Sequence, residues 1–192
     1  MAKPQSNART VSSVRILGID PGTLHCGYAV IETGGATVVR PRYVECGVIE
    51  MSAQLSLPQR LLVLARDLRE VIGELEPDEV SLEAAFHGKN AQSALRLGHA
   101  RGAIMLVAAE AKLPLAEYPP ATVKRTVAGH GRADKTEIQR IVTYLCSLKK
   151  VPSPDAADAL AIAICHAYHS AAPALLRRAQ DGARTRRTQP TR

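Results

Sequence analysis

Four acidic residues stand at the ends of predicted strands or at the start of a predicted helix, and their placement constrains the fold more than any other feature. Asp20 closes a short apolar run and is followed by a Pro-Gly turn, and Glu83 closes a second apolar run. Asp155 and Asp158 are three residues apart at the start of an Ala-rich stretch, so they share one face of a helix. Because α/β folds expose functional groups at strand ends, the four acids predict a single acidic site.

Carboxylates that converge in a partly dry site require a cation. Ligands that offer only oxygen select a hard divalent metal, usually Mg²⁺, and a pair of such ions is suited to cutting phosphodiesters. Each acid alone also fits a structural role: Asp155 and Asp158 favour the start of a helix, and Asp20 suits a turn. Glu83 fits such a role less well, because an acid that ends an apolar strand is unfavourable to bury without a partner. The joint placement therefore favours a metal site.

The net charge of +7 over 192 residues is unevenly distributed. Residues 43–85 hold three basic and nine acidic residues, whereas residues 86–150 hold eleven basic and four acidic ones. Residues 177–192 add six Arg against one Asp. A basic middle beside an acidic site indicates a polyanionic partner such as nucleic acid, although a charged surface with polar ends explains the charge equally well.

The four cysteines, Cys26, Cys46, Cys146 and Cys165, show neither a C-x-x-C pair nor the spacing of a zinc site. This pattern predicts reduced thiols in a cytoplasmic protein. No N-terminal stretch resembles a signal peptide, and the longest apolar run, 103–109, is too short to cross a bilayer, so no membrane partner is expected.

The order of predicted elements is three β segments, then αβαβ and closing helices, which indicates an α/β domain with a mixed sheet. The predicted strands are 14–20, 27–32, 43–50, 80–83 and 115–118. The predicted helices run from a capping box at Ser56 to Pro77, over 90–112, from the cap Asp134 to about Ser147, and from Ser153 to about Ser170. We expect a disordered extension at 1–13, one domain over 14–172 and a basic disordered tail at 173–192.

Basic residues cluster around a Gly-His-Gly loop, with Lys124 before it and Lys135 after it. They form either a solvated face or a set of phosphate ligands. The segment 129–136 nearly matches a P-loop, but Asp134 stands where the second Gly belongs and no convincing strand precedes it. Asp134 suits a helix N-cap better. Phe86, the single Phe, lies three residues after Glu83 on a polar loop, where it either enters the core or stacks on bases.

The chain resembles the RuvC family of bacterial Holliday-junction resolvases. The resemblance runs from about residue 14 to residue 169 and rests on four strings: 18–23 (GIDPGT), 82–90 (LExxFxxKN), 93–102 (SALxLGxARG) and 155–161 (DAADALA). It implies an RNase H-like fold, with a mixed five-stranded sheet flanked by helices. It also implies a homodimer that resolves four-way DNA junctions by paired, symmetric, Mg²⁺-dependent nicks in recombination and repair, together with the RuvA and RuvB branch-migration proteins as partners.

The resemblance also assigns roles to residues. The positions that match the family's metal-binding, catalytic acids are Asp20, Glu83, Asp155 and Asp158. The positions expected to contact DNA are Lys124 and Lys135 near the scissile phosphate, Phe86 at the bases of the crossover, and Lys89. In the implied reaction, Asp20 bridges two Mg²⁺ ions, for which Mn²⁺ can substitute, and one ion activates water while the other stabilises the leaving oxygen.

Two alternatives come from other functional classes. The string Asp20-x-Gly22-Thr23 also resembles the phosphate loop of RNase H-like ATP-binding proteins, but those close a second lobe over ATP and this sequence is too short for one. A non-cleaving junction-binding module is the other alternative. Four acids would only repel DNA in such a module unless they held a metal.

Overall fold

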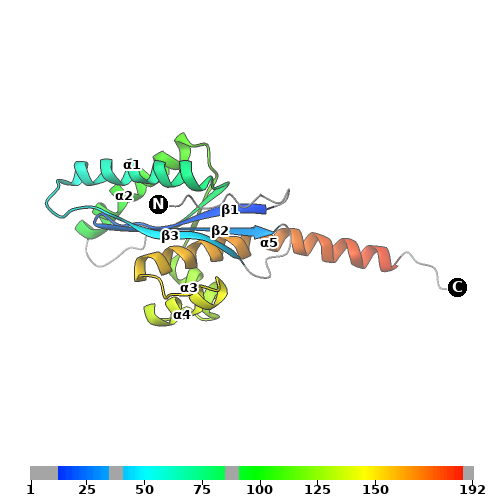
Figure 1. The fold of residues 1–192 in the computed structure, drawn as a ribbon. Coiled ribbons are helices and arrows are strands. Elements are labelled where there is room, and N and C mark those ends of the chain that lie inside the picture. The colour runs from blue at the N-terminus through cyan, green and yellow to red at the C-terminus, as the bar shows by residue number, and fades with distance from the viewer. Residues whose placement is uncertain (1–12, 35–40, 85–90, 188–192) are drawn as a thin grey trace.

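The computed structural model describes residues 13–34, 41–84 and 91–187, with side chains described as far as Ser170. Five strands form one mixed sheet with helices on both faces (Figure 1). Two residues expected to contact DNA, Phe86 and Lys89, lie outside the described residues, as do the extension 1–12 and the last residues of the predicted tail.

The sheet has the strand order β3-β2-β1-β4-β5. β1 pairs antiparallel with β2, which pairs antiparallel with β3, whereas β4 runs parallel to both β1 and β5. The strands are β1 (Ser13–Asp20), β2 (His25–Gly34), β3 (Arg42–Glu50), β4 (Glu79–Glu83) and β5 (Leu115–Tyr118). All five strands were predicted, and the mixed sheet is confirmed.

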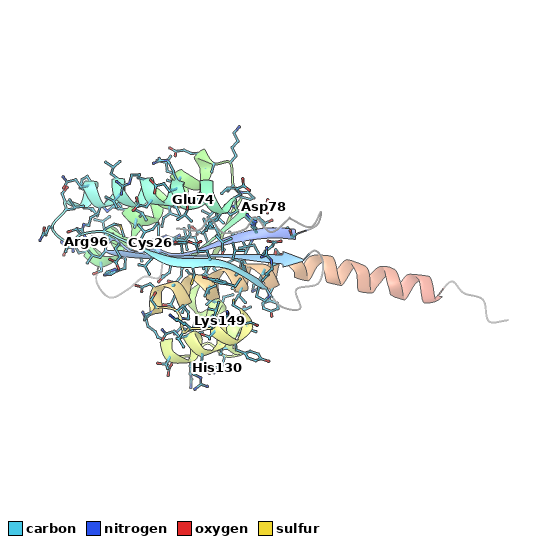
Figure 2. All side chains as sticks on the ribbon, viewed as in Figure 1. Cys26, Glu74, Asp78, Arg96, His130 and Lys149 are labelled. Carbon is cyan, nitrogen blue, oxygen red and sulfur yellow. The ribbon has the colours of Figure 1, made fainter. Side chains whose placement is uncertain are left out.

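The helices form two layers. Figure 1 shows α1 (Leu57–Leu75) and α2 (Ala91–Glu110) on one face of the sheet, and α3 (Pro120–Ala128), α4 (Lys135–Leu145) and α5 (Pro154–Arg187) on the other. Each layer has its own apolar core. In Figure 2, Glu74 lies on the side of α1, and His130 lies on the opposite side beyond α4. The central strand β1 is apolar on both faces because both are covered: Ile16 belongs to the core under α5, and Leu17 to the core under α1 and α2.

The predicted helix starts are confirmed by their caps. The N–H of Ser56 donates to Oε1 of Gln59 at 2.9 Å, and Oδ1 of Asp134 accepts the N–H of Glu137 at 2.8 Å. Asp134 therefore caps α4, and α3, rather than a strand, precedes its loop, so the rejection of a P-loop is confirmed.

Two helices differ from the prediction. No helix was predicted between the strand 115–118 and the cap Asp134, yet α3 begins at Pro120. Proline lacks a backbone N–H, and the first position of a helix does not need one. α5 was expected to end near Ser170, but it continues to Arg187 through residues assigned to a disordered tail. Ala, Leu and Arg are strong helix formers, and a helix already started by a packed segment extends easily. The division of the chain at residues 14 and 172 stays a prediction.

α5 lies directly on β1 and β2. The backbones approach so closely at Gly18 that a Cβ there would overlap the carbonyl oxygen of Ala159 and lie 2.7 Å from the nitrogen of Ala163. Only glycine fits this position. The missing side chain at Gly18 therefore allows the short distance between α5 and the sheet.

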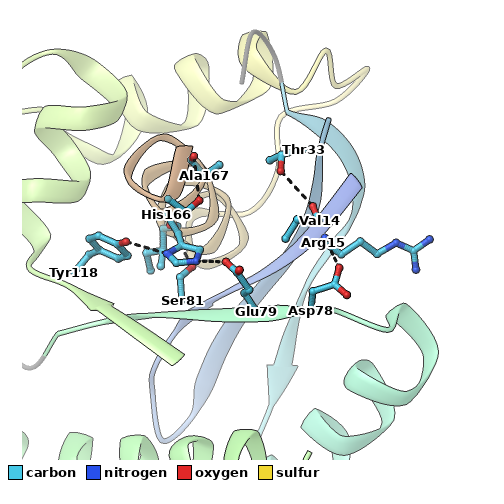
Figure 3. Close-up of polar contacts among 11 residues, drawn as sticks. Val14, Arg15, Thr33, Asp78, Glu79, Ser81, Tyr118, His166 and Ala167 are labelled. Atoms are coloured by element: carbon cyan, nitrogen blue, oxygen red, sulfur yellow. Dashed lines mark hydrogen bonds and ion pairs between the residues drawn. The ribbon is translucent and has the colours of Figure 1, made fainter. Parts of the chain in front are cut away.

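A polar network ties the middle of α5 to the parallel strands (Figure 3). His166, which is 8% exposed, places Nε2 2.7 Å from Oε2 of Glu79 on β4 and Nδ1 2.9 Å from Oη of Tyr118 on β5. One buried side chain thus joins a helix to two strands of the sheet.

Within the described residues, none of the helices combines the length and the apolar character that crossing a membrane requires.

We predict that Gly18→Ala lowers the free energy of unfolding by about 2 kcal/mol or more, because the added methyl meets backbone atoms that cannot turn away. Gly73→Ala is the matched control: Gly73 lies on α1 with nothing within 4 Å of an added Cβ, and Ala is the better helix former there. Urea unfolding of both variants tests the packing. Equal stabilities of Gly18→Ala and the unchanged protein would contradict it.

Candidate active site

Asp20 and Glu83 meet at one edge of the sheet. β1 and β4 are parallel neighbours, and their register pairs Ile19 with Leu82, so the next residue on each strand is an acid. Parallel strands expose their carboxyl ends at the same edge, which is where a ligand site is expected in an α/β sheet. This part of the predicted site therefore follows from the pairing of two strands.

The first turns of α5 bring the aspartate pair to the same edge. Ser153 caps the helix, with its Oγ 3.4 Å from the N–H of Ala156. A Cβ on Gly27, the partner of Asp20 on β2, would lie 2.6 Å from the carbonyl carbon of Asp155. The absence of a side chain at Gly27 therefore lets the start of α5 reach the end of β1.

A cavity of about 310 Å³ opens at this edge. Three of the four predicted acids and two of the three predicted lysines line it: Asp20, Glu83, Asp158, Lys124 and Lys135. Lys124 comes from α3 and Lys135 from the first residue of α4. The three carboxylates thus come from the sheet and α5, and the two lysine side chains come from the neighbouring helices α3 and α4.

Asp20 is the most strongly perturbed of these acids. Burial, followed by the negative charges of Glu83, Asp158 and Asp155, raises the pKa of Asp20 to about 8, and Lys135 lowers it only in part. The site therefore favours a proton, or another positive charge, at Asp20 near neutral pH.

Two more of the predicted acids in the cavity, Glu83 and Asp158, also have raised pKa values. Burial and the charge of Asp158 raise the pKa of Glu83, against the opposing charges of Lys124, Arg101 and Lys135. Burial also raises the pKa of Asp158, although Lys135 places Nζ 3.7 Å from its Oδ2. Clustered perturbed carboxyls in a cavity indicate a functional site.

The donor set fits a divalent cation in its chemistry, because it consists of carboxylates whose mutual repulsion a cation would relieve. The side chains are not gathered around one point, however: no group of three or more His, Cys, Asp or Glu among the described residues has the geometry of a shared metal site. Asp155 does not line the cavity, and its negative charge contributes to the raised pKa of Asp20.

Sequence analysis missed Arg101 of α2. Its guanidinium donates to the backbone carbonyl of Glu83 and lowers the pKa of that carboxyl. A signal was present, since Arg101 is a charged residue on the helical face that also carries Ile104 and Ala108, both buried. A cation within an apolar face predicts a buried anionic or carbonyl partner.

Comparison with known proteins gives a consistent result. The family profile of crossover junction endodeoxyribonuclease RuvC matches residues 16–166. A crossover junction endodeoxyribonuclease RuvC from Halorhodospira halophila is 47% identical over 170 residues, covering 88% of this chain and 98% of the relative. The structure of Thermus thermophilus RuvC in complex with a Holliday junction substrate is similar, with a TM-score of 0.76 at 33% identity, over 83% of this chain and 96% of that one. A second T. thermophilus RuvC structure gives a TM-score of 0.73 at 34% identity, over 82% of this chain and 95% of that one.

We predict that Asp20→Asn stabilises the protein in the presence of a metal chelator. Because the folded state raises the pKa of Asp20 from 3.8 to about 8, folding retains a proton that the unfolded chain releases, and stability falls as the pH rises from about 4 to about 8. Asn removes this penalty. We expect a gain of roughly 1–3 kcal/mol at pH 8, well below the full shift because the site relaxes and is partly solvated, and none at pH 4.

Thermal melting at the two pH values measures this effect. Glu70→Gln, which neutralises an exposed acid on α1, is the control and should show no such pH-dependent gain. A lower melting temperature of Asp20→Asn at pH 8 would contradict the electrostatic description.

Proposed function

This chain belongs to the RuvC family of crossover junction endodeoxyribonucleases, and from that membership we propose that it resolves four-way DNA junctions by paired, symmetric nicks in homologous recombination and repair. The fold is RNase H-like, as the resemblance implied. The observation that carries the proposal is the cavity at the sheet edge, where three carboxylates and two lysines from five different elements come together.

We propose Mg²⁺ as the cofactor, with two ions in each site and Mn²⁺ able to substitute. Asp20, Glu83, Asp155 and Asp158 would hold it. When bound, it would polarise the scissile phosphate and activate water. The raised pKa of Asp20 supports this assignment, because a dication at the site would replace the proton that the carboxylate otherwise retains.

The two lysines would bind the phosphate backbone of the DNA. Lys135 is 70% exposed in its side chain, and its only described anionic contact is the 3.7 Å pair with Asp158, so its ammonium is free to approach a phosphate. Lys124 lines the same cavity from α3. Together they would offset the negative charge that grows on the phosphorus centre in the transition state. Phe86 and Lys89 keep their proposed roles at the crossover on the resemblance alone.

Neither alternative function is favoured. The family profile covers most of the domain, and the cluster of acids beside lysines is the arrangement that a nuclease requires. A non-cleaving module would bind junctions without nicking them, which the cleavage experiment below tests. An ATP-binding protein would instead bind a labelled nucleotide and leave the junction uncut.

The outer face of α2 supports the proposed homodimer. Along this helix, Leu95, Gly98, Gly102, Met105 and Leu106 fall on one stripe. Leu95 is 62% exposed and Leu106 is 58% exposed, and nothing lies within 4 Å of an added Cβ at either glycine. The opposite face of α2 is already buried against the sheet. A helix that is apolar on two faces is usually buried on both, and the glycines would let a second copy approach closely.

We also propose a cytoplasmic location and contacts with the RuvA and RuvB proteins.

We predict that Asp20→Asn lowers the cleavage rate of a mobile four-way junction by at least about a hundredfold in Mg²⁺, because a carboxylate that would hold the cation is lost. Binding of the junction in EDTA should be unchanged or tighter, since a charge that repels phosphate is removed. Gel-shift and single-turnover cleavage assays on the same preparation measure both. Near-normal nicking by the variant, or cleavage by the unchanged protein without any divalent ion, would contradict the assignment.

We predict that Leu106→Glu dissociates the homodimer, raising its dissociation constant on the order of a hundredfold, because a two-fold axis would bury the new charge twice. Leu62→Glu is the matched control, since Leu62 is 69% exposed on α1 and lies outside the α2 stripe. Sedimentation equilibrium separates the two variants. A chain that is monomeric before mutation would contradict the dimer.

A further inference from the structure

Arg101 is a charged side chain on the buried face of α2. The residue is 7% exposed and lies between Ala100 and Ile104, both of which are fully buried. A guanidinium in such a place is unfavourable unless its donors are satisfied. Its partners therefore explain why it is there.

The two ends of the guanidinium bind two different strands. Nη1 donates to the backbone carbonyl oxygen of Glu83, at the end of β4. Nη2 lies 2.6 Å from Oε1 of Glu117 on β5. The planar fork of an arginine can satisfy two acceptors at once, so Arg101 joins α2 to the ends of two neighbouring strands.

The end of β4 has little other support among the described residues. The register with β1 ends at Leu82, so Glu83 is paired on one side only, with Tyr118 of β5. One further backbone bond holds this end, from the N–H of Ala84 to the carbonyl of Tyr118 at 2.8 Å. The hydrogen bond from Arg101 to the carbonyl of Glu83 is a further contact that holds this end of β4.

We propose that Arg101 is a positioning residue of the nuclease site, which holds the backbone of Glu83 so that its carboxylate faces Asp20 and Asp158. Arg101 does not itself line the cavity, so it acts on the site through Glu83. The consequence for cleavage rests on the proposed function, whereas the local tie to β4 does not.

A purely structural ion pair would behave differently. In that case the loss of Arg101 would weaken the whole domain evenly, and any loss of cleavage would follow the loss of folded protein. A positioning role instead predicts local loosening at the end of β4 together with a loss of cleavage in protein that is still folded.

The experiment compares Arg101→Gln with Arg69→Gln. Arg69 is a matched control, because it carries the same charge and pairs with Glu110 of α2 at 2.8 Å on the surface. Hydrogen exchange of the amides at 82–84 is measured without metal, alongside thermal melting, junction binding in EDTA and single-turnover cleavage in Mg²⁺. For Arg101→Gln we expect exchange at 82–84 to rise at least about tenfold more than elsewhere, and cleavage to fall about 10–100-fold, with junction affinity within about twofold. Arg69→Gln should change none of these.

Two further variants keep the test decisive. Arg101→Lys keeps the charge but cannot reach both acceptors, so we expect it to recover only part of the lost rate. Glu117→Gln leaves Arg101 in place and weakens one arm of the fork; it carries the test if Arg101→Gln does not fold, with a smaller rise in exchange at 82–84. Unchanged exchange at 82–84, or a uniform rise across the chain that matches the lost stability, would overturn the proposal. If the unchanged protein does not cleave junctions, the proposed function fails, and the exchange data still decide whether Arg101 holds β4.

Discussion

α5 packs closely against β1 and β2, because glycines stand at two points where the helix backbone would overlap an added Cβ. Gly18 lets the helix lie on the central strand, and Gly27 lets its first turn reach the end of β1. The aspartates of α5 therefore arrive at the edge where Asp20 and Glu83 already lie. Any side chain at these glycines would lift the helix and separate its acids from those of the sheet.

This convergence is electrostatically unfavourable in the protein alone. Burial and mutual repulsion raise the pKa values of Asp20, Glu83 and Asp158, and the surrounding cations oppose the shift without cancelling it. Binding a positive charge at such a site relieves the repulsion and is therefore favourable. A fold that keeps these carboxyls together in spite of their repulsion would suit the cation-dependent cleavage that we propose.

α2 connects two parts of this function. Its inner face carries Arg101, which reaches the end of β4, and its outer face carries the exposed stripe proposed as the dimer contact. Gly102 lies beside Arg101 in sequence and belongs to that outer stripe. The helix that supports one active site would therefore also set the separation of the two active sites in a dimer, which a symmetric junction requires.

The strands, most helix boundaries and the acidic residues could all be predicted from the sequence. Apolar runs, caps such as Asp134 and acids at strand ends are local signals, and the parallel pairing of two such strands places Asp20 beside Glu83. α3 was missed because it starts directly after a pair of prolines, which usually interrupt regular structure, although a proline can also occupy the first position of a helix.

What the sequence by itself determined, then, was the set of elements and the type of chemistry at their ends. The tertiary structure alone decided which side chains share the cavity, that Asp155 is not among its lining residues, and that Arg101 donates to the backbone carbonyl of Glu83. These features depend on the contact between α5 and the sheet and on a bridge from α2 to β4 and β5. Contacts between segments far apart in the chain leave no periodic pattern in either segment, so they become visible only when the segments pack.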